Sequence, residues 1–402
     1  MSRSRLANAR VHALRRRWFG VFLATGLAYI LAPALSWGEK LRYHLEPASF
    51  EQLPGFFNDR LEDALKVFVK TCHNPAAGVA IVEQLDRSAQ AKACSAARRG
   101  EGGRDPRKFF TRRFQPFRVV TDGADDAFFT GYYQPEIPGS LQKSQGFPIP
   151  VYGYPPDLVI LPSTQRSGAL ANLTAARRNR DGGLEPYPDR GAIEDGVLEN
   201  VKGLKKLVYL RDNVDLFLAQ VQGSARVRLP DGGILRLSFA ARNGQPYTSL
   251  ARLLVERGVA TPSDMSMRRL AAWIRENGIE RGQAGDDLLR RNRSYIFFNA
   301  NLEKKRAEQP MGGSGASLTP LRSIAVDAHI WPYGLPFFVD AMMPWRSVET
   351  EPFRRVVIAQ DTGSAIVGPG RADIYFGLDD RAGERASEIR HHGQFYVLLP
   401  RN

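Results

Sequence analysis

The sequence predicts a mainly β protein with flanking helices. The segment 320–400 holds many short apolar runs separated by Gly and Pro, and residues 214–240 form apolar-polar alternations around the turn Asp231-Gly232-Gly233. Many short strands with Gly and Pro turns are typical of barrels rather than of doubly wound sheets. The chain has 402 residues, 43% of them hydrophobic, so it is long enough for two domains with a real core.

The amino-terminal segment predicts that the protein is exported from the cytoplasm. Six arginines within the first seventeen residues precede an uncharged run at 18–38, and Ala32-Pro33-Ala34 is an A-x-A-like cleavage signature, as in a secretory signal peptide. Residues 14–19 also resemble a twin-arginine signal faintly. The run of ~20 residues is equally long enough for an uncleaved anchor, which would associate residues 18–38 with the inner membrane. We expect a protein of the periplasm or cell envelope, and not a lipoprotein, because no cysteine precedes Cys72.

Cys72 and Cys94 are the two cysteines of the chain. In an oxidising compartment such a pair predicts a disulfide, which would close a loop of ~20 residues and contribute ~3 kcal/mol. Two buried free thiols are the alternative. Without a matching His pattern the pair is not expected to bind zinc.

Four segments have helical spacing of apolar residues or helix-end signals. The expected helices cover residues 58–73, 78–97, 247–258 and 263–277. The last has Ser263 or Asp264 as its N-cap and Gly278 just past its end. Residues 98–108 are rich in Gly, Pro and charge and predict a loop, and strand character begins at Phe109.

The charge restricts the class of partner. The net charge is +14 and the pI about 9.9, which suits nucleic acid, an anionic membrane or an acidic polymer. We find no nucleic-acid-binding motif, so no nucleic-acid partner is expected. His329, His391 and His392 are not at metal-ligand spacing, so no metal site is expected either.

Three aspartates, Asp327, Asp361 and Asp373, border apolar runs near the carboxyl end. Any one of them could be a turn cap. Three in one small β unit predict a carboxylate cluster, in which the members raise one another's pKa. Asp361 opens the D-T-G-S sequence of aspartic proteases, but those enzymes need two such loops and no second D-[ST]-G exists, so a protease is not expected.

Two further segments are candidate binding elements. The stretch "FFTGYYQP" places Thr130 next to Tyr132 and Tyr133, a mix of flat apolar faces and polar groups that suits a sugar ring. A strand with one aromatic face inward is the alternative. Similarly, Gln222-Gly223-Ser224 could line a groove or simply turn the chain.

Seven blocks in order over about 120–400 carry a family resemblance. They are "FTGYYQPEIPGS", "PYPDRGAIEDG", "VDLFLAQVQGSARVRLPDG", "NGQPYTSLARLLVERG", "NRSYIFFN", "LTPLRSIAVDAHIWPYGLPFFVDA" and "QDTGSAIVGPGRADIYFG". Together they resemble the membrane-bound lytic murein transglycosylase A family, and the last two resemble its 3D domain, named for three aspartates. The resemblance implies a double-psi β-barrel domain with a second β domain inserted and a groove between them.

Applied to this chain, the resemblance implies a barrel that begins in 41–140, an inserted β domain at 141–240, and the rest of the barrel at 241–402 with the 3D segment at 320–400. It implies that Asp373 is the catalytic acid and that Asp327 and Asp361 support it. It also implies a groove that includes Thr130, Tyr133, Gln222, Gly223 and Ser224.

The implied activity is lytic transglycosylation of peptidoglycan glycan strands, a carbon–oxygen lyase reaction on a polysaccharide (EC 4.2.2.-). It would cleave the β-1,4 bond between N-acetylmuramic acid and N-acetylglucosamine without water and leave a 1,6-anhydro end, with one Asp as acid and then base and no cofactor. The alternatives are a glycoside hydrolase, with Glu136 or Asp361 activating water, and a non-catalytic glycan-binding module.

The local sequence also favours Asp373 over Asp361 as the acid. Thr362-Gly363 after Asp361 offers a hydroxyl and backbone groups that bond a carboxylate and keep it ionised. Asp373 stands between Ala372 and Ile374, an environment that predicts a raised pKa and a protonated side chain.

Overall fold

The computed structural model describes residues 43–72, 85–123, 126–261, 265–303, 309–363 and 365–401. Residues 41–402 form one compact unit. The predicted signal or anchor at 1–38 lies outside the described residues. The expected N-caps Ser263 and Asp264 were wrong, because the helix over Met267–Glu276 has Ser266 as its N-cap. In the described ranges, no helix combines the length and the apolar character needed to cross a bilayer.

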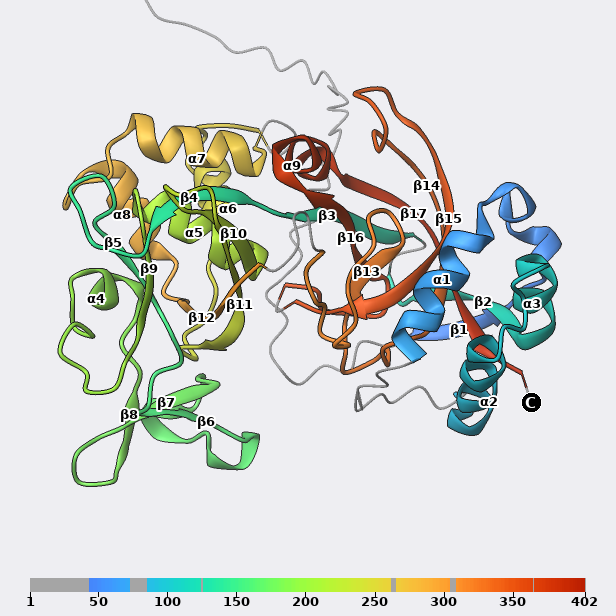
Figure 1. The fold of residues 1–402 in the computed structure, drawn as a ribbon, viewed down its shortest axis with the longest axis horizontal. Helices are drawn as coiled ribbons and strands as arrows, with labels where there is room; N and C mark the ends of the chain where they lie inside the picture. The colour runs from blue at the N-terminus through green and yellow to red at the C-terminus, as the bar shows by residue number, and fades with distance from the viewer. Residues whose placement is uncertain are drawn as a thin grey trace, which may run out of the picture. The chain divides into compact units, whose positions relative to one another are not determined.

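The larger sheet closes on itself. Its strands are β1 (Tyr43–Pro47), β2 (Phe114–Thr121), β3 (Ala127–Gln134), β13 (Ser323–Val326), β14 (Pro336–Met343), β15 (Glu351–Asp361), β16 (Arg371–Leu378) and β17 (Arg390–Pro400). They pair in the order β1-β2-β17-β14-β15-β13-β16-β3, and β3 pairs again with β17, so the strands from β17 round to β3 form a closed ring (Figure 1). The ring protects the strands within it from exposing an edge.

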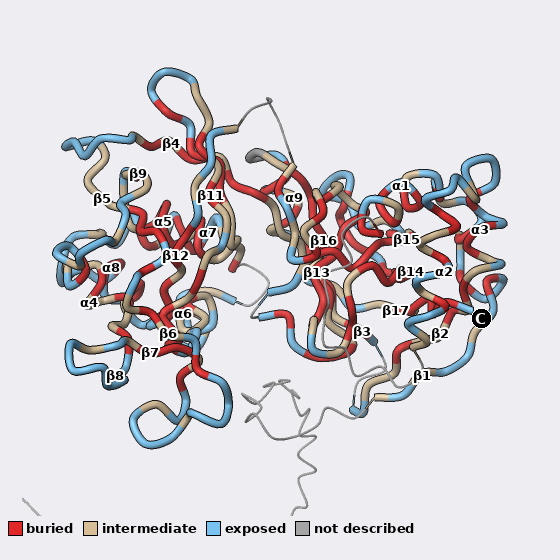
Figure 2. Tube along the Cα trace, turned by 60° about the horizontal axis from the view of Figure 1, so that its bottom comes forward, coloured by how far each residue is buried: buried red, intermediate tan, exposed pale blue. Residues whose placement is uncertain are grey.

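Several ring strands are buried on both faces, which explains the long apolar runs. On β14, Phe337 and Val339 face the interior of the ring, whereas Phe338 packs against the amino-terminal helices. On β15, Val357 faces the interior and Val356 the helices. Most residues along these strands are therefore buried, as Figure 2 shows for β14 and β15.

Three helices pack on the outer side of the ring: α1 (Leu61–Cys72) on β15, α2 (Arg87–Arg98) on β17 and α3 (Pro106–Arg113) on β2. The first two agree with predicted helices, with later starts at residues 61 and 87. Cys72 and Cys94, the predicted pair, form a disulfide that joins α1 to α2, with their α-carbons 5.3 Å apart.

The strand predicted from Phe109 was wrong, because residues 106–113 form α3 and β2 starts only at Phe114. Asp105 caps this helix by accepting from the backbone N–H of Lys108, and Pro106 occupies the first turn. The helix buries Phe109 and Phe110 side by side. The adjacent aromatic residues were therefore the cause of the wrong strand prediction.

The second sheet has six strands: β4 (Glu136–Ser140), β5 (Ile149–Tyr152), β9 (Lys206–Leu210), β10 (Ser224–Arg228), β11 (Ile234–Arg242) and β12 (Ile296–Leu302). Their order is β12-β11-β10-β4-β9-β5. We expected the inserted domain to end at residue 240, and the sheet instead takes in β12, which pairs with β11. The chain leaves this sheet and returns to the ring after residue 302.

Helices accompany the second sheet: α4 (Arg190–Glu194), α5 (Asn213–Gln222), α6 (Leu250–Glu256), α7 (Met267–Glu276) and α8 (Ala284–Arg291). The β prediction for 214–240 was wrong for its first part, which is α5. Leu216 and Ala219 of α5 pack in the sheet core, whereas Val214 and Phe217 pack among α6–α8. A helix that is apolar on several sides loses the periodicity of a surface helix. The rest is the expected hairpin, and Gly232 adopts φ 84° at its turn.

Two smaller elements complete the unit. Strands β6 (Leu158–Ile160), β7 (Ala175–Arg178) and β8 (Leu184–Pro186) form a small antiparallel sheet. Helix α9 (Asp379–Glu388) lies directly on β3. A β-carbon at Gly131 would lie 2.8 Å from the α-carbon of Ala386, and one at Gly383 would lie 2.6 Å from the ring of Tyr133. These two glycines allow the close contact that holds β3 in place beside the site.

Candidate functional site

Asp361, Ala325, Asp373 and Thr130 lie in one row across four neighbouring strands of the ring. Ala325 of β13 is opposite both Asp361 of β15 and Asp373 of β16, and Asp373 is opposite Thr130 of β3. Side chains directly opposite one another point to the same face of a sheet. Neighbouring strands lie ~4.8 Å apart, so the α-carbons of the two aspartates are separated by roughly 10 Å. The small side chain of Ala325 leaves open space between two carboxylates.

This face of the ring lines a cavity of about 430 Å³. The ring side contributes Tyr132, Ala325, Asp361, Thr362, Gly363 and Asp373, and the second sheet with α5 contributes Gln222, Gly223, Ser224, Ser238, Phe239 and Arg242. Ligand sites are typically concave and of ~300–1,000 Å³. Residues from both β units therefore converge on a space of the size that a small ligand or part of a polymer needs.

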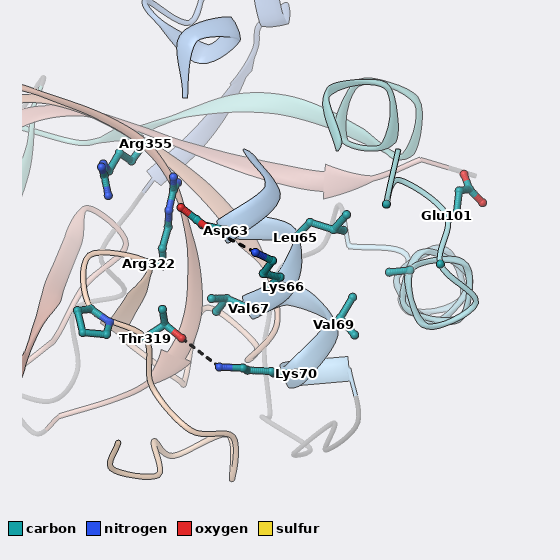
Figure 3. Close-up of a pocket in the computed structure, with 14 residues that line it drawn as sticks. Asp63, Leu65, Lys66, Val67, Val69, Lys70, Glu101, Thr319, Arg322 and Arg355 are labelled. Carbon is teal, nitrogen blue, oxygen red and sulfur yellow. Dashed lines mark hydrogen bonds and ion pairs between the residues drawn. The ribbon is translucent and has the colours of Figure 1, made fainter. Parts of the chain in front are cut away.

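A second cavity, of about 550 Å³, lies beside α1. Its lining includes Asp63, Lys66, Lys70, Thr319, Arg322 and Arg355 (Figure 3). Lys70 Nζ lies 3.5 Å from Thr319 Oγ1, and Lys66 Nζ lies 3.9 Å from a carboxylate oxygen of Asp63. None of the predicted site residues lines this cavity. The candidate site is therefore the smaller cavity, which holds two of the three predicted carboxylates.

Asp373 has one oxygen engaged and one available. Thr130 Oγ1 donates a hydrogen bond of 2.7 Å to Oδ1, and Arg371 in turn donates to Thr130 Oγ1 at 2.7 Å. Within the described part of the chain, Oδ2 has no hydrogen-bond partner. Burial raises the pKa of Asp373, while the Arg371 charge and the Thr130 hydroxyl oppose the rise. The arrangement suits a carboxylic acid whose free oxygen can carry a proton to a ligand.

Asp361 is more fully engaged. The backbone N–H groups of Gly313 and Thr362 each donate to Oδ1 at 2.9 Å, and the Tyr132 hydroxyl donates to Oδ2 at 2.9 Å. Burial raises the pKa of Asp361, these three donors lower it, and the charge of Asp373 raises it. The predicted backbone bonds are present. The predicted hydroxyl bond is not, because Thr362 Oγ1 donates to the Val326 carbonyl instead.

Asp327 is not among the residues that line the cavity. Its Oδ1 accepts from the backbone N–H of His329 at 3.0 Å, and its Oδ2 accepts from the backbone N–H of Gly368 at 2.8 Å. It therefore ties the turn after β13 to the loop that leads into β16. Of the three predicted carboxylates, this one supports the site through the backbone.

The predicted binding residues divide into three groups. Tyr132, Gln222, Gly223 and Ser224 line the cavity. Thr130 does not line the cavity, and instead donates a hydrogen bond to Asp373, which does. Tyr133 is turned away: its ring packs on α9 at Gly383, while its backbone N–H donates to Gln222 Oε1 at 3.2 Å.

The sequence Gln222-Gly223-Ser224 is the point where α5 ends and β10 begins. Gly223 adopts φ 71° as the C-cap of the helix, and the strand starts at the next residue. A left-handed residue at this position favours glycine. The turn carries Gln222 to β3, so the segment both turns the chain and lines the cavity.

Sequence reasoning missed the two arginines of the site. Arg371 stands two residues before Asp373 on the same strand, and its guanidinium lies 5.3 Å from the centre of the Phe128 ring. Arg242 lines the cavity from the end of β11. The period of two in a strand could have placed Arg371 on the face of Asp373. Among the described residues, no three His, Cys, Asp or Glu side chains are grouped in a way that could hold a metal ion.

Known proteins resemble this chain in sequence and in fold. Residues 128–299 match the MltA specific insert domain, and residues 322–399 match the 3D domain. The chain is 30% identical to membrane-bound lytic murein transglycosylase A of Escherichia coli K12 over 301 residues, which covers 72% of this chain and 71% of that protein. The protein of the same name from Vibrio cholerae is 30% identical over 284 residues, 69% and 66% of the two chains.

A solved structure is similar over nearly its whole length. The membrane-bound lytic murein transglycosylase of Agrobacterium tumefaciens superimposes with a TM-score of 0.77 at 33% identity. The match covers 89% of this chain and 97% of that one. The similarity therefore extends over most of the chain, across both β units.

Proposed function

Because the chain belongs to the family of membrane-bound lytic murein transglycosylase A, we propose that it cleaves the glycan strands of peptidoglycan by lytic transglycosylation. The scissile bond is the β-1,4 link between N-acetylmuramic acid and N-acetylglucosamine. The observation that carries the proposal is Asp373: a carboxyl in a ligand-sized cavity, with a raised pKa and one unengaged oxygen.

Asp373 acts first as an acid. Its proton passes to the glycosidic oxygen as the bond from that oxygen to the anomeric carbon of the muramic residue breaks. The anomeric carbon acquires oxocarbenium character, and the departing N-acetylglucosamine keeps the proton as its new hydroxyl. Burial favours the protonated acid before this step, and Thr130 holds the carboxyl in position by its bond to Oδ1.

Asp373 then acts as a base. The 6-hydroxyl of the same muramic residue attacks the anomeric carbon, and the carboxylate takes the hydroxyl proton. The product is a 1,6-anhydromuramic end, no water is consumed, and Asp373 is protonated again. Arg371 and Thr130 stabilise the carboxylate between the two steps, since both lower the pKa of Asp373. No step requires a cofactor.

Asp361 in the same cavity supports a second candidate function, hydrolysis. In that reaction a second carboxylate would activate water. The other predicted base, Glu136, is outside the cavity lining and accepts from Arg226 Nη1 at 2.6 Å and from Arg228 Nε at 2.7 Å. Mass spectrometry of muropeptides released by the purified protein decides between the two reactions: anhydro ends support transglycosylation, and reducing ends support hydrolysis.

A non-catalytic glycan-binding module is the third alternative. It would bind peptidoglycan without releasing fragments. A cleared zone in a peptidoglycan gel, absent for an Asp373→Asn variant, would exclude this alternative.

We also propose a location and a finer architecture. The arginine-flanked run at 18–38 would export the protein to the periplasm or the cell envelope, either as a cleaved signal or as an inner-membrane anchor. Cell fractionation that finds the full-length protein in the cytosol would contradict this. We propose that the ring strands have the double-psi connection and that the inserted domain extends through β12.

A further inference from the structure

Arg242 is the one cation among the described residues that line the candidate cavity. It ends β11, where Ile296 of β12 is its partner in the register. Ser238, four residues earlier on β11, also lines the cavity and is opposite Ser224. A strand rises ~3.3 Å per residue, so Arg242 is roughly 13 Å farther along the cavity wall than this serine pair.

Arg242 has no ion-pair or hydrogen-bond partner in the part of the chain that the structure describes. Burial lowers its pKa, and no carboxylate of the described residues opposes the change. A desolvated charge is costly unless it is compensated. The fully buried Arg190 and Arg226 are ion-paired, with Glu194 and with Glu136 and Glu303 respectively. The half-buried Arg371 donates to Thr130, and Arg355 lies over the Trp345 ring.

The described residues of the cavity lining offer no partner for this charge. Its two carboxylates, Asp361 and Asp373, belong to the ring wall and have donors of their own. Gln220, which also lines the cavity, accepts from Arg190 and donates to the Ile296 carbonyl. A guanidinium held open in a ligand cavity is suited to a carboxylate or phosphate of the ligand.

We infer that Arg242 binds a carboxylate that the glycan carries on the lactyl arm of its muramic residue. The inference rests on the proposed function, because that function supplies the muramic residue. The carboxylate has two possible sources: the lactyl group itself in a strand without peptides, and the stem peptide where the lactyl carboxyl is an amide. A chito-oligosaccharide carries neither a lactyl group nor a stem peptide, so it is the uncharged ligand for comparison.

The test measures binding without turnover. The full-length Asp373→Asn variant is titrated by calorimetry with three ligands: chitohexaose, peptide-free glycan strands and peptide-bearing strands. The same titrations are repeated with the double variant Asp373→Asn, Arg242→Gln. We expect Arg242→Gln to weaken at least one carboxylate-bearing ligand about tenfold more than chitohexaose, since charge-assisted hydrogen bonds are among the stronger ones. Arg242→Lys should retain most of the difference, and higher salt should reduce it.

The pattern among ligands identifies the source of the carboxylate. Selective weakening of peptide-free strands assigns the lactyl carboxylate, and selective weakening of peptide-bearing strands assigns the stem. Arg268→Gln is the matched control, because Arg268 is exposed on α7 and lies outside the cavity. Equal weakening of all three ligands, or none, would overturn the inference. Failure of the wild-type protein to release fragments would instead refute the proposed reaction.

Discussion

Replacing Asp373 with Asn removes the proposed acid while changing little else. The amide has nearly the shape of the carboxyl, and its oxygen can accept the 2.7 Å hydrogen bond from Thr130. It cannot give up a proton to the glycosidic oxygen or take one from the 6-hydroxyl. A positioned acid or base is worth ~10²–10⁴-fold in rate. Because one carboxyl serves both steps, we expect a loss toward the upper end, or about 5 kcal/mol in the barrier.

The stability of this variant has a sign that follows from the pKa. Burial raises the folded-state pKa of Asp373 above the ~3.9 usual for Asp. The protonated carboxyl therefore contributes stability at pH below the unfolded value, and this contribution is lost as the pH rises through the folded value. An amide does not ionise. The free energy of unfolding of Asp373→Asn should therefore rise relative to that of wild type as the pH increases above about 4.

The assay is the release of 1,6-anhydromuropeptides from purified sacculi, followed by chromatography and mass spectrometry, with thermal unfolding to verify the fold. Asp340→Asn is the matched control, since Asp340 is a strand aspartate that pairs with Arg354 outside the cavity. Near-wild-type release by folded Asp373→Asn would refute the mechanism. If Asp373→Asn neither folds nor releases muropeptides, the folded Asp373→Ser variant is tested in its place.

Three further outcomes follow from the site and the disulfide. Arg371→Gln removes a charge that lowers the pKa of Asp373, so the alkaline limb of the pH profile of kcat/KM should move to higher pH; a limb that stays or falls would contradict the assignment. Asp361→Asn presents three donors with only one accepting oxygen, so it should lower stability by ~1–3 kcal/mol and reduce activity only partly; calorimetry that finds no destabilisation would oppose this. Reducing the Cys72–Cys94 bond should cost ~3 kcal/mol in denaturant unfolding, and peptide mapping that finds two alkylatable thiols in the native protein would deny the bond.

The sequence was most informative where one face of an element meets water. Helix α1 was predicted from its apolar spacing, and the β10–β11 hairpin from its turn. It was least informative where elements are buried on several sides, because periodicity then disappears. Helix α5, which lies between two cores, was predicted as a strand, and so was the second half of α3, where Phe109 and Phe110 are adjacent.

The candidate site was partly predictable for a similar reason. Asp361 and Asp373 could be predicted because burying a carboxylate beside an apolar run costs free energy unless it is bonded or paired. Their neighbours in space, Thr130 and Tyr132, are more than two hundred residues away in sequence, and only the pairing of β3 with β16 brings them together. The roles of Tyr133 and Asp327 depend on side-chain direction and loop geometry, which a motif does not contain.

The hydrogen bonds of the two carboxylates argue for a reaction that needs one of them. A carboxylate has about four lone-pair sites, and Asp361 uses three of them on Gly313, Thr362 and Tyr132. A water molecule at Asp361 would have to use the remaining site on Oδ2, beside the tyrosine hydroxyl. Asp373, which also lines the cavity, has a single hydrogen bond to the described residues, and its Oδ2 has no partner among them. Internal attack by a hydroxyl that the substrate already carries removes the need for a second base, so the uneven engagement of the pair favours transglycosylation over hydrolysis.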